Sequence, residues 1–194
     1  MPTALLVNGA EPREPMASGS LNTLLVESAR AALSPSHAIL TTVIRDGYDV
    51  RDEQRKFKQA DVVIFQVPVF WFSLPSSMKK YIDDVYAYGV FFGVTEHYGR
   101  GGLLRDKAYL LSTTWNAASS DFGSAATILG DRTPDDVLAS FHLTQQYVGL
   151  SPLASFAEYD VVQRPDAVGA TSRLREHLRR HVIDVREGGL QEVS

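Results

Sequence analysis

Three aromatic residues stand together just after an apolar run, and such side chains could hold a flat ligand. The run Val62–Phe65 leads into a loop that contains Pro68, Val69, Phe70, Trp71 and Phe72. In open α/β sheets, ligands bind beyond the carboxyl ends of parallel strands. A short exposed loop seldom collects aromatic rings unless they cover something apolar. We therefore expect this loop to face a planar cofactor; core packing or a dimer surface is the alternative for Phe70 and Phe72.

Small polar residues precede the first amphipathic stretch and could bind a phosphate. Ser18, Gly19 and Ser20 stand before Leu21 and Asn22, where a helix is expected to begin. The free N–H groups and the dipole of a helix N-terminus favour an anion, and hydroxyl and amide side chains can add donors. Plain capping by serine is the alternative. Neither a G-x-G-x-x-G pattern nor a P-loop is present, which disfavours a Rossmann dinucleotide site and a kinase.

A third polar group follows another apolar run. Thr114, Trp115 and Asn116 come after the stretch 107–112 and offer a hydroxyl, an indole ring and an amide. We expect them to lie beside the same ligand, because the carboxyl ends of parallel strands share one edge of a sheet. Core packing is the alternative for Trp115.

The periodicity of the chain predicts the sheet that would position these three loops. Continuous apolar runs indicate strands that are covered on both faces, and helical patterns separate them. We expect strands at 4–7, 38–43, 62–67, 107–112 and 153–158, and helices at 21–32, 49–59, 76–86, 134–148 and 171–185. Asp49 is the expected N-cap of the second helix. The alternation predicts an α/β fold, with a doubly wound five-stranded parallel sheet of order 2-1-3-4-5 and helices on both faces.

Length and spacing indicate one domain. We expect residues 1–186 to form it and residues 187–194 to be a flexible tail. The segments 86–105 and 117–133 have weak periodicity, and loops of this length in a compact domain usually serve function or an interface.

Composition excludes several kinds of chemistry. The chain has no cysteine, so disulfides, thiolate metal sites and cysteine nucleophiles are excluded. The formal net charge is -4, and the basic run Arg173–His181 has the apolar stripe of a solvated helix, so we expect no nucleic-acid partner. His177 and His181 in that run are interpreted as surface residues, and no metal site is expected.

The amino terminus lacks the pattern of a signal peptide, and no apolar stretch approaches the roughly 20 residues of a membrane span. We therefore expect a cytoplasmic protein without membrane insertion.

Several short motifs, in order along nearly the whole chain, resemble one family. The motifs are VNGA (7–10), GSLN (19–22), QVPVFWF (66–72), MKKYIDDV (78–85), GRGGLL (99–104), LSTTWNA (111–117), FH (141–142) and GLSPL (149–153). They are similar to the flavodoxin-like NAD(P)H:quinone oxidoreductases, in the modulator of drug activity B branch that is related to DT-diaphorase. The resemblance implies a flavodoxin-like fold, tightly bound FAD, NADPH or NADH as electron donor, a quinone or similar planar acceptor, and a homodimer.

The resemblance also implies roles for the three loops. The diphosphate would lie by 18–22, and the flavin ring would rest on 68–71 and take hydrogen bonds from 114–116. In a two-step hydride transfer, Trp71 and Phe72 would stack the nicotinamide or the quinone, and Asn116 would stabilise charge on the reduced ring. Met16 and Ala17 replace a His-Ser pair that the family often carries, which removes a phosphate or adenine contact, and LGDRT (129–133) replaces a more glycine-rich pattern. FMN therefore remains an alternative to FAD. Azo, nitroaromatic or specialised-metabolite acceptors and a non-enzymatic electron carrier are the alternative functions.

Overall fold

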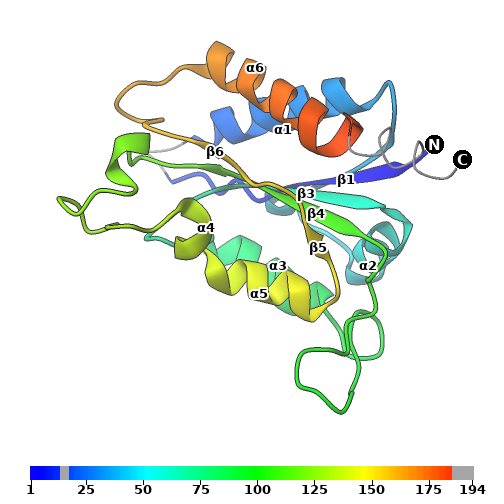
Figure 1. Ribbon diagram of the computed structural model, residues 1–194. Coiled ribbons are helices and arrows are strands. Elements are labelled where there is room, and N and C mark those ends of the chain that lie inside the picture. The colour runs from blue at the N-terminus through cyan, green and yellow to red at the C-terminus, as the bar shows by residue number, and fades with distance from the viewer. Residues whose placement is uncertain (14–17, 185–194) are drawn as a thin grey trace, which may run out of the picture.

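A parallel sheet of order β2-β1-β3-β4-β5 forms the centre of the molecule, as the computed structural model of residues 1–13 and 18–184 shows (Figure 1). Its strands are β1 (Thr3–Asn8), β2 (Ala38–Val43), β3 (Val62–Pro68), β4 (Ala108–Thr114), β5 (Ser151–Pro152) and β6 (Phe156–Glu158). All pairings between them are parallel. The predicted fold class and strand order are confirmed.

The fifth position of the sheet differs from the single strand predicted at 153–158. Two short strands occupy it: β5 pairs with the start of β4, and β6 pairs with its last three residues. Pro152 ends β5, and proline has no N–H to donate to the ladder. One further bond, from the Leu153 N–H to the Tyr109 carbonyl at 2.8 Å, keeps the chain beside β4 across the interruption.

The helices follow the predicted alternation, and two of them differ clearly from their predicted extent. They are α1 (Ser20–Leu33), α2 (Val50–Gln59), α3 (Ser76–Val85), α4 (Pro134–Val137), α5 (Ala139–Tyr147) and α6 (Ala167–Leu178), with short turns η1 (Ile44–Asp46), η2 (Ser119–Asp121) and the π-helical η3 (Arg179–Ile183). Asp49 caps α2 as predicted, because its carboxylate accepts the Asp52 N–H at 2.9 Å. The helix predicted at 134–148 is broken at Leu138, and α6 begins earlier than predicted, behind its cap Asp166. The predicted tail at 187–194 lies outside the described residues.

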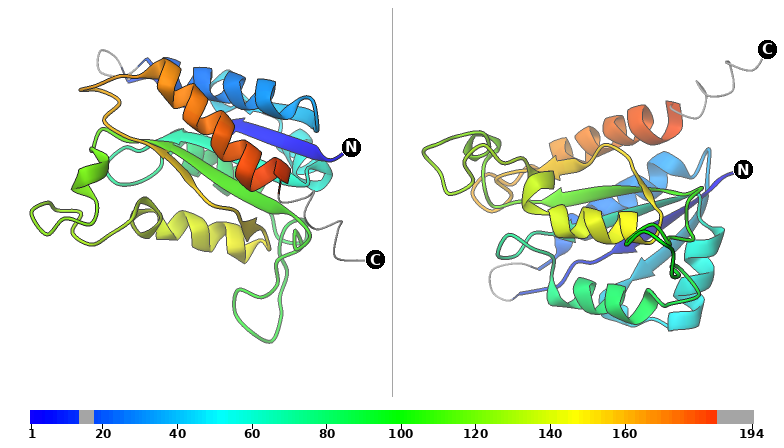
Figure 2. Two further views of the ribbon diagram at one scale, coloured as in Figure 1. Left: turned by 45° about the horizontal axis from the view of Figure 1, so that its top comes forward. Right: turned by 60° about the horizontal axis from the view of Figure 1, so that its bottom comes forward.

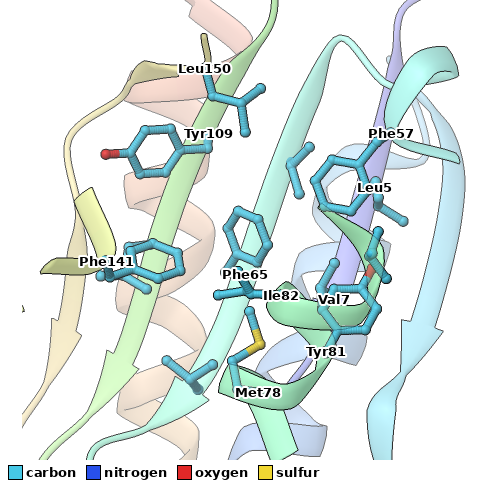
Figure 3. Close-up of a cluster of buried hydrophobic side chains, with 14 of the residues drawn as sticks. Leu5, Val7, Phe57, Phe65, Met78, Tyr81, Ile82, Tyr109, Phe141 and Leu150 are labelled. Carbon is cyan, nitrogen blue, oxygen red and sulfur yellow. The ribbon is translucent and has the colours of Figure 1, made fainter. Parts of the chain in front are cut away.

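Helices cover both faces of the sheet, as Figures 1 and 2 show from three directions. Alternate strand residues point to opposite faces. Leu6, Ile64 and Leu110 pack against α1 and α6 on one face. On the other face, Val7, Phe65 and Tyr109 pack with α2, α3 and α5, and Figure 3 shows Met78, Tyr81 and Ile82 of α3 directed at this side of the sheet. The sheet is therefore a rigid support for the loops at its carboxyl edge.

The segment 86–105, between α3 and β4, extends away from the sheet (Figure 1). Among the described residues, none of the helices has the length and apolar character needed to cross a membrane.

Candidate functional site

The loops after β1, β3 and β4 are tied to one another at the carboxyl edge of the sheet. The Val69 N–H donates to the Thr114 carbonyl at 3.0 Å, which joins the loops after β3 and β4. The Asn22 side chain donates to the Thr114 hydroxyl at 3.1 Å, which joins the start of α1 to the end of β4. Glu11, in the loop after β1, bonds to Ser77 at the start of α3. The three groups predicted to share a ligand therefore lie at one site.

The loop after β3 forms a tight turn, residues 70–73, which we name the aromatic hairpin. Its ends exchange two main-chain bonds, from the Phe70 N–H to the Ser73 carbonyl at 2.9 Å and from the Ser73 N–H back to Phe70 at 3.0 Å. Trp71 and Phe72, between them, have φ values of 52° and 59°. Two-residue turns with both φ values positive strongly prefer Asn and Gly, and left-handed backbone costs other residues roughly 1–2 kcal/mol each.

The strained residues of the hairpin face solvent. Trp71 is 85% exposed and Phe72 is 48% exposed, although both are large and apolar. Neither burial nor backbone preference accounts for aromatic residues at these two positions. Strain of this kind collects at ligand-binding and catalytic sites, so the geometry strengthens the prediction that Trp71 and Phe72 serve a ligand.

The remaining residues of this loop form its base. Pro68 is buried at the end of β3, whereas Val69 and Phe70 are half-buried. The guanidinium of Arg13, from the loop after β1, lies 4.3 Å from the centre of the Phe70 ring. Phe70 is therefore in contact with the loop that precedes the expected phosphate site.

The start of α1 has the features of an anion site. Gly19 is its N-cap, with φ of 75°, a backbone conformation that glycine adopts without strain. The Ser18 hydroxyl accepts the Ser20 N–H at 3.3 Å, and the first turn contains no acidic residue. Within residues 1–13 and 18–184, the N–H groups of Leu21 and Asn22 have no acceptor. These donors and the helix dipole favour a phosphate.

A buried polar network lies directly beneath the site. The Gln66 amide donates to Asn22 Oδ1 at 2.8 Å, and the Ser112 hydroxyl donates to Gln66 Oε1 at 2.6 Å. Asn22 also bonds to Thr114, and all four side chains are at least 95% buried. The Asn22 side chain thus fixes α1 to β3 and β4, and only its main-chain N–H is left for a ligand. Sequence reasoning missed Gln66 and Ser112, although polar residues inside apolar strands were a usable signal.

The residues predicted in the loop after β4 differ in their exposure to solvent. Trp115 is 3% exposed, and its indole N–H donates to the Thr113 hydroxyl at 2.8 Å. Its main-chain N–H donates to the Glu158 carbonyl at 2.8 Å, and its ring packs edge-on against Phe122. Asn116 is exposed, and its amide has no hydrogen-bond partner among the described residues. Asn116 is therefore the residue of this loop whose side chain is available to a ligand, while Trp115 packs in the core and its cofactor contact stays a prediction.

Glu11 and Arg13 are site residues that the sequence analysis missed. The Glu11 carboxylate accepts the Ser77 hydroxyl at 2.8 Å and the Ser77 N–H at 3.2 Å, with Ser76 Oγ at 3.4 Å. The hydroxyl of Ser77, above all, lowers the pKa of Glu11 from its ordinary value. Glu11 is therefore an anion at neutral pH, bound at the N-terminus of α3.

The histidines named in the sequence analysis lie on α6 and the turn after it. The rings of His177 and His181 are 4.4 Å apart, and His177 Nε2 lies 2.8 Å from the Ala154 carbonyl. Burial, above all, lowers the pKa of His177. In the described part of the chain, no group of three or more His, Cys, Asp or Glu is arranged to hold a metal ion.

Known proteins share this sequence and fold. A family model described as a flavodoxin-like fold matches residues 2–182. NADPH:quinone oxidoreductase MdaB of Haemophilus influenzae is 35% identical over 173 residues, 84% of this chain and 90% of that protein. A ribosyldihydronicotinamide dehydrogenase (quinone) of Rattus norvegicus is 41% identical over 83 residues, 43% of this chain and 35% of that protein.

The structural match agrees with these relatives. The crystal structure of a Klebsiella pneumoniae protein assigned as a quinone reductase superposes with a TM-score of 0.74 and 26% identity, over 99% of this chain and 85% of that one. The family match covers nearly the whole chain, and the MdaB similarity extends over most of both proteins. The chain therefore belongs to the flavodoxin-like NAD(P)H:quinone oxidoreductase family.

Proposed function

We propose that this protein is a flavin-dependent NAD(P)H:quinone oxidoreductase. The observation that carries the proposal is the aromatic hairpin, which holds Trp71 and Phe72 exposed in strained conformations at the same edge of the sheet as the N-terminus of α1, whose N-cap Gly19 makes no side-chain cap bond. A flat cofactor with a phosphate tail needs both features at one edge of the sheet. The relatives named quinone oxidoreductases support the same activity.

The residues present fit a flavin. Ser18, Gly19, Ser20 and the main-chain N–H groups of Leu21 and Asn22 would hold the phosphate, since the first turn has donors and no competing acid. Pro68, Val69, Phe70 and Trp71 would support the ring, and the Thr114–Asn116 loop would supply its hydrogen bonds, with the free amide of Asn116 foremost. We propose FAD, with FMN as the alternative; Met16 and Ala17, on which that choice partly rests, lie outside the described residues.

The chain's own part in the reaction is binding and orientation. A bound flavin would supply the redox chemistry, which is acceptance of a hydride from the nicotinamide and, in a separate step, reduction of the acceptor by two electrons with protons. Trp71 and Phe72 would stack NADPH or NADH first and the quinone afterwards, and such stacking contributes about 0.5–1.5 kcal/mol beyond burial. Asn116 would donate to the part of the ring that gains negative charge. No nucleophilic side chain is required, so the two aromatic residues and Asn116 are the proposed catalytic residues.

We also propose a homodimer that uses α3, α5 and the segment 86–105. Exposed apolar residues collect there: Tyr98 is 94% exposed, Val94 84% and Leu143 65%. The Tyr147 ring links the groups, at 5.7 Å from Tyr98 and 5.2 Å from Phe92. An apolar surface of this kind marks an interface. Leu143→Glu should shift the sedimentation coefficient to that of a monomer, whereas Val168→Glu, at an even more exposed apolar residue on α6, should not. A dimer that persists in Leu143→Glu would exclude this surface.

The proposed donor is a cytoplasmic metabolite, so we place the enzyme in the cytoplasm.

The proposed oxidoreductase activity is tested by the visible spectrum of the purified protein, followed by anaerobic addition of NADPH and then of a quinone. A flavin spectrum that bleaches directly to the two-electron reduced form and recovers with quinone supports it. A stable one-electron form would indicate an electron carrier, recovery with azo or nitroaromatic compounds alone would change the acceptor, and protein that stays colourless after FAD or FMN is added would overturn the proposal.

A further inference from the structure

The loop after β1 contacts the aromatic hairpin at Phe70 and the helix that follows the hairpin at Ser77. Its two turn residues are strained, and strained backbone persists only where the surrounding structure holds it. Beyond its own two main-chain bonds, the hairpin region receives the Arg13 guanidinium over Phe70 and the Glu11 carboxylate at Ser77, four residues past Ser73. Both contacts come from the segment 11–13, which leads from β1 toward the start of α1.

Glu11 supplies a cap that α3 lacks in its own sequence. The residue at the N-cap is Pro75, which has no side-chain acceptor, and the first turn of α3 contains no acid. An anion at this position is bound by the helix N–H groups and by the helix dipole. Glu11 provides it from 66 residues away in sequence, with both the hydroxyl and the N–H of Ser77 as donors. Ser73 and Pro75 are separated by Leu74 alone, so fixing the start of α3 also fixes the end of the hairpin.

We propose that Glu11 is a positioning residue that holds the aromatic hairpin in the conformation that presents Trp71 to the acceptor. The inference rests on the proposed function for its kinetic consequence, but the hold on Trp71 is a property of the chain alone. Loss of Glu11 releases the start of α3, the hairpin then samples other conformations, and the acceptor loses a preformed stacking surface. Arg13 makes the second contact of the same segment, through the base of the hairpin.

The test compares Glu11→Ala, Ser77→Ala and the double variant in full-length protein, with Asp49→Ala as the matched control. Asp49 also caps a ten-residue helix, α2, but touches neither the hairpin nor the loop after β1. Glu11→Gln keeps an acceptor oxygen without the charge and should behave between wild type and Glu11→Ala. The fluorescence anisotropy decay of Trp71 is recorded in a Trp115→Phe background, because the chain has two tryptophans.

We expect Glu11→Ala to raise KM for the quinone about three- to tenfold, with kcat changed less than about twofold in protein saturated with flavin. The fast component of the Trp71 anisotropy should grow most in Glu11→Ala and less in Ser77→Ala, because Ser77→Ala keeps the main-chain N–H bond and the Ser76 bond to Glu11. The double variant should match Glu11→Ala, because both substitutions act on one contact. Asp49→Ala should lower the melting temperature without changing KM for the quinone or the anisotropy decay of Trp71.

An unchanged Trp71 anisotropy in Glu11→Ala, or additive effects in the double variant, would overturn the proposal. If wild-type protein binds no flavin, the proposed function fails, while the anisotropy data still decide whether Glu11 holds the hairpin.

Discussion

The two tryptophans of the chain follow neighbouring strands of one sheet and have opposite environments. Trp71 is 85% exposed with a strained backbone, whereas Trp115 is 3% exposed with both of its N–H groups bonded inside the protein. A shared position at the carboxyl edge therefore does not give two residues the same role. Trp115 stabilises the loop on which it lies, whereas neither burial nor backbone preference accounts for Trp71 at its position, which is why we propose that it serves a ligand.

The largest expected effect is a difference in the free energy of unfolding between variants of the two tryptophans. Trp115→Ala should lower the free energy of unfolding by about 3–5 kcal/mol, because it leaves a cavity beside Phe122 and removes the indole N–H that donates to the Thr113 hydroxyl. Trp71→Ala should change it by less than about 0.5 kcal/mol, as is usual for exposed positions. Urea unfolding of both variants measures the difference. Equal losses would mean that the hairpin is part of the core and that the comparison is wrong.

A smaller effect, of opposite sign, should follow when the hairpin receives the residues its backbone prefers. Trp71→Asn together with Phe72→Gly places Asn-Gly in the turn with two positive φ values. We expect the free energy of unfolding to rise by about 1 kcal/mol as strain is relieved, while quinone reduction falls at least about tenfold for lack of a stacking surface. Thermal unfolding and steady-state assays test both halves. A variant that is more stable and fully active would remove these side chains from the site.

The smallest effect concerns pH. The pKa of Glu11 lies below its ordinary 4.5, mainly through the Ser77 hydroxyl. Its contact with α3 should therefore stabilise the hairpin fully above about pH 4.5 and be lost as the pH falls through the lower, folded-state value. Acrylamide quenching should show the Trp71 environment loosening below that pH before Trp115 becomes accessible. In Glu11→Gln this early step should be absent; if it persists unchanged, another group is responsible.

The sequence predicts the sheet better than the site. The strand at 38–43 has the predicted bounds, and the Asp49 cap is confirmed, because both depend on residues close together in the chain. Of the fifth strand predicted at 153–158, only β6 at 156–158 forms, after the two-residue β5 that lies outside the predicted range. The helix predicted at 134–148 is interrupted at Leu138. Burial of Trp115 depends on Phe122 and on β6, and the anchoring of α3 depends on Glu11. Contacts between such distant residues have no signature in local periodicity.

The measurement that tests the account most directly follows both half-reactions of flavin-loaded protein by anaerobic stopped-flow, in wild type and Trp71→Ala. If the exposed hairpin serves donor and acceptor in turn, reduction by NADPH and reoxidation by quinone should each slow by about tenfold or more in Trp71→Ala saturated with flavin, with the melting temperature unchanged. Two half-reactions at wild-type rates in Trp71→Ala would contradict the account and leave the strain at Trp71 without a function.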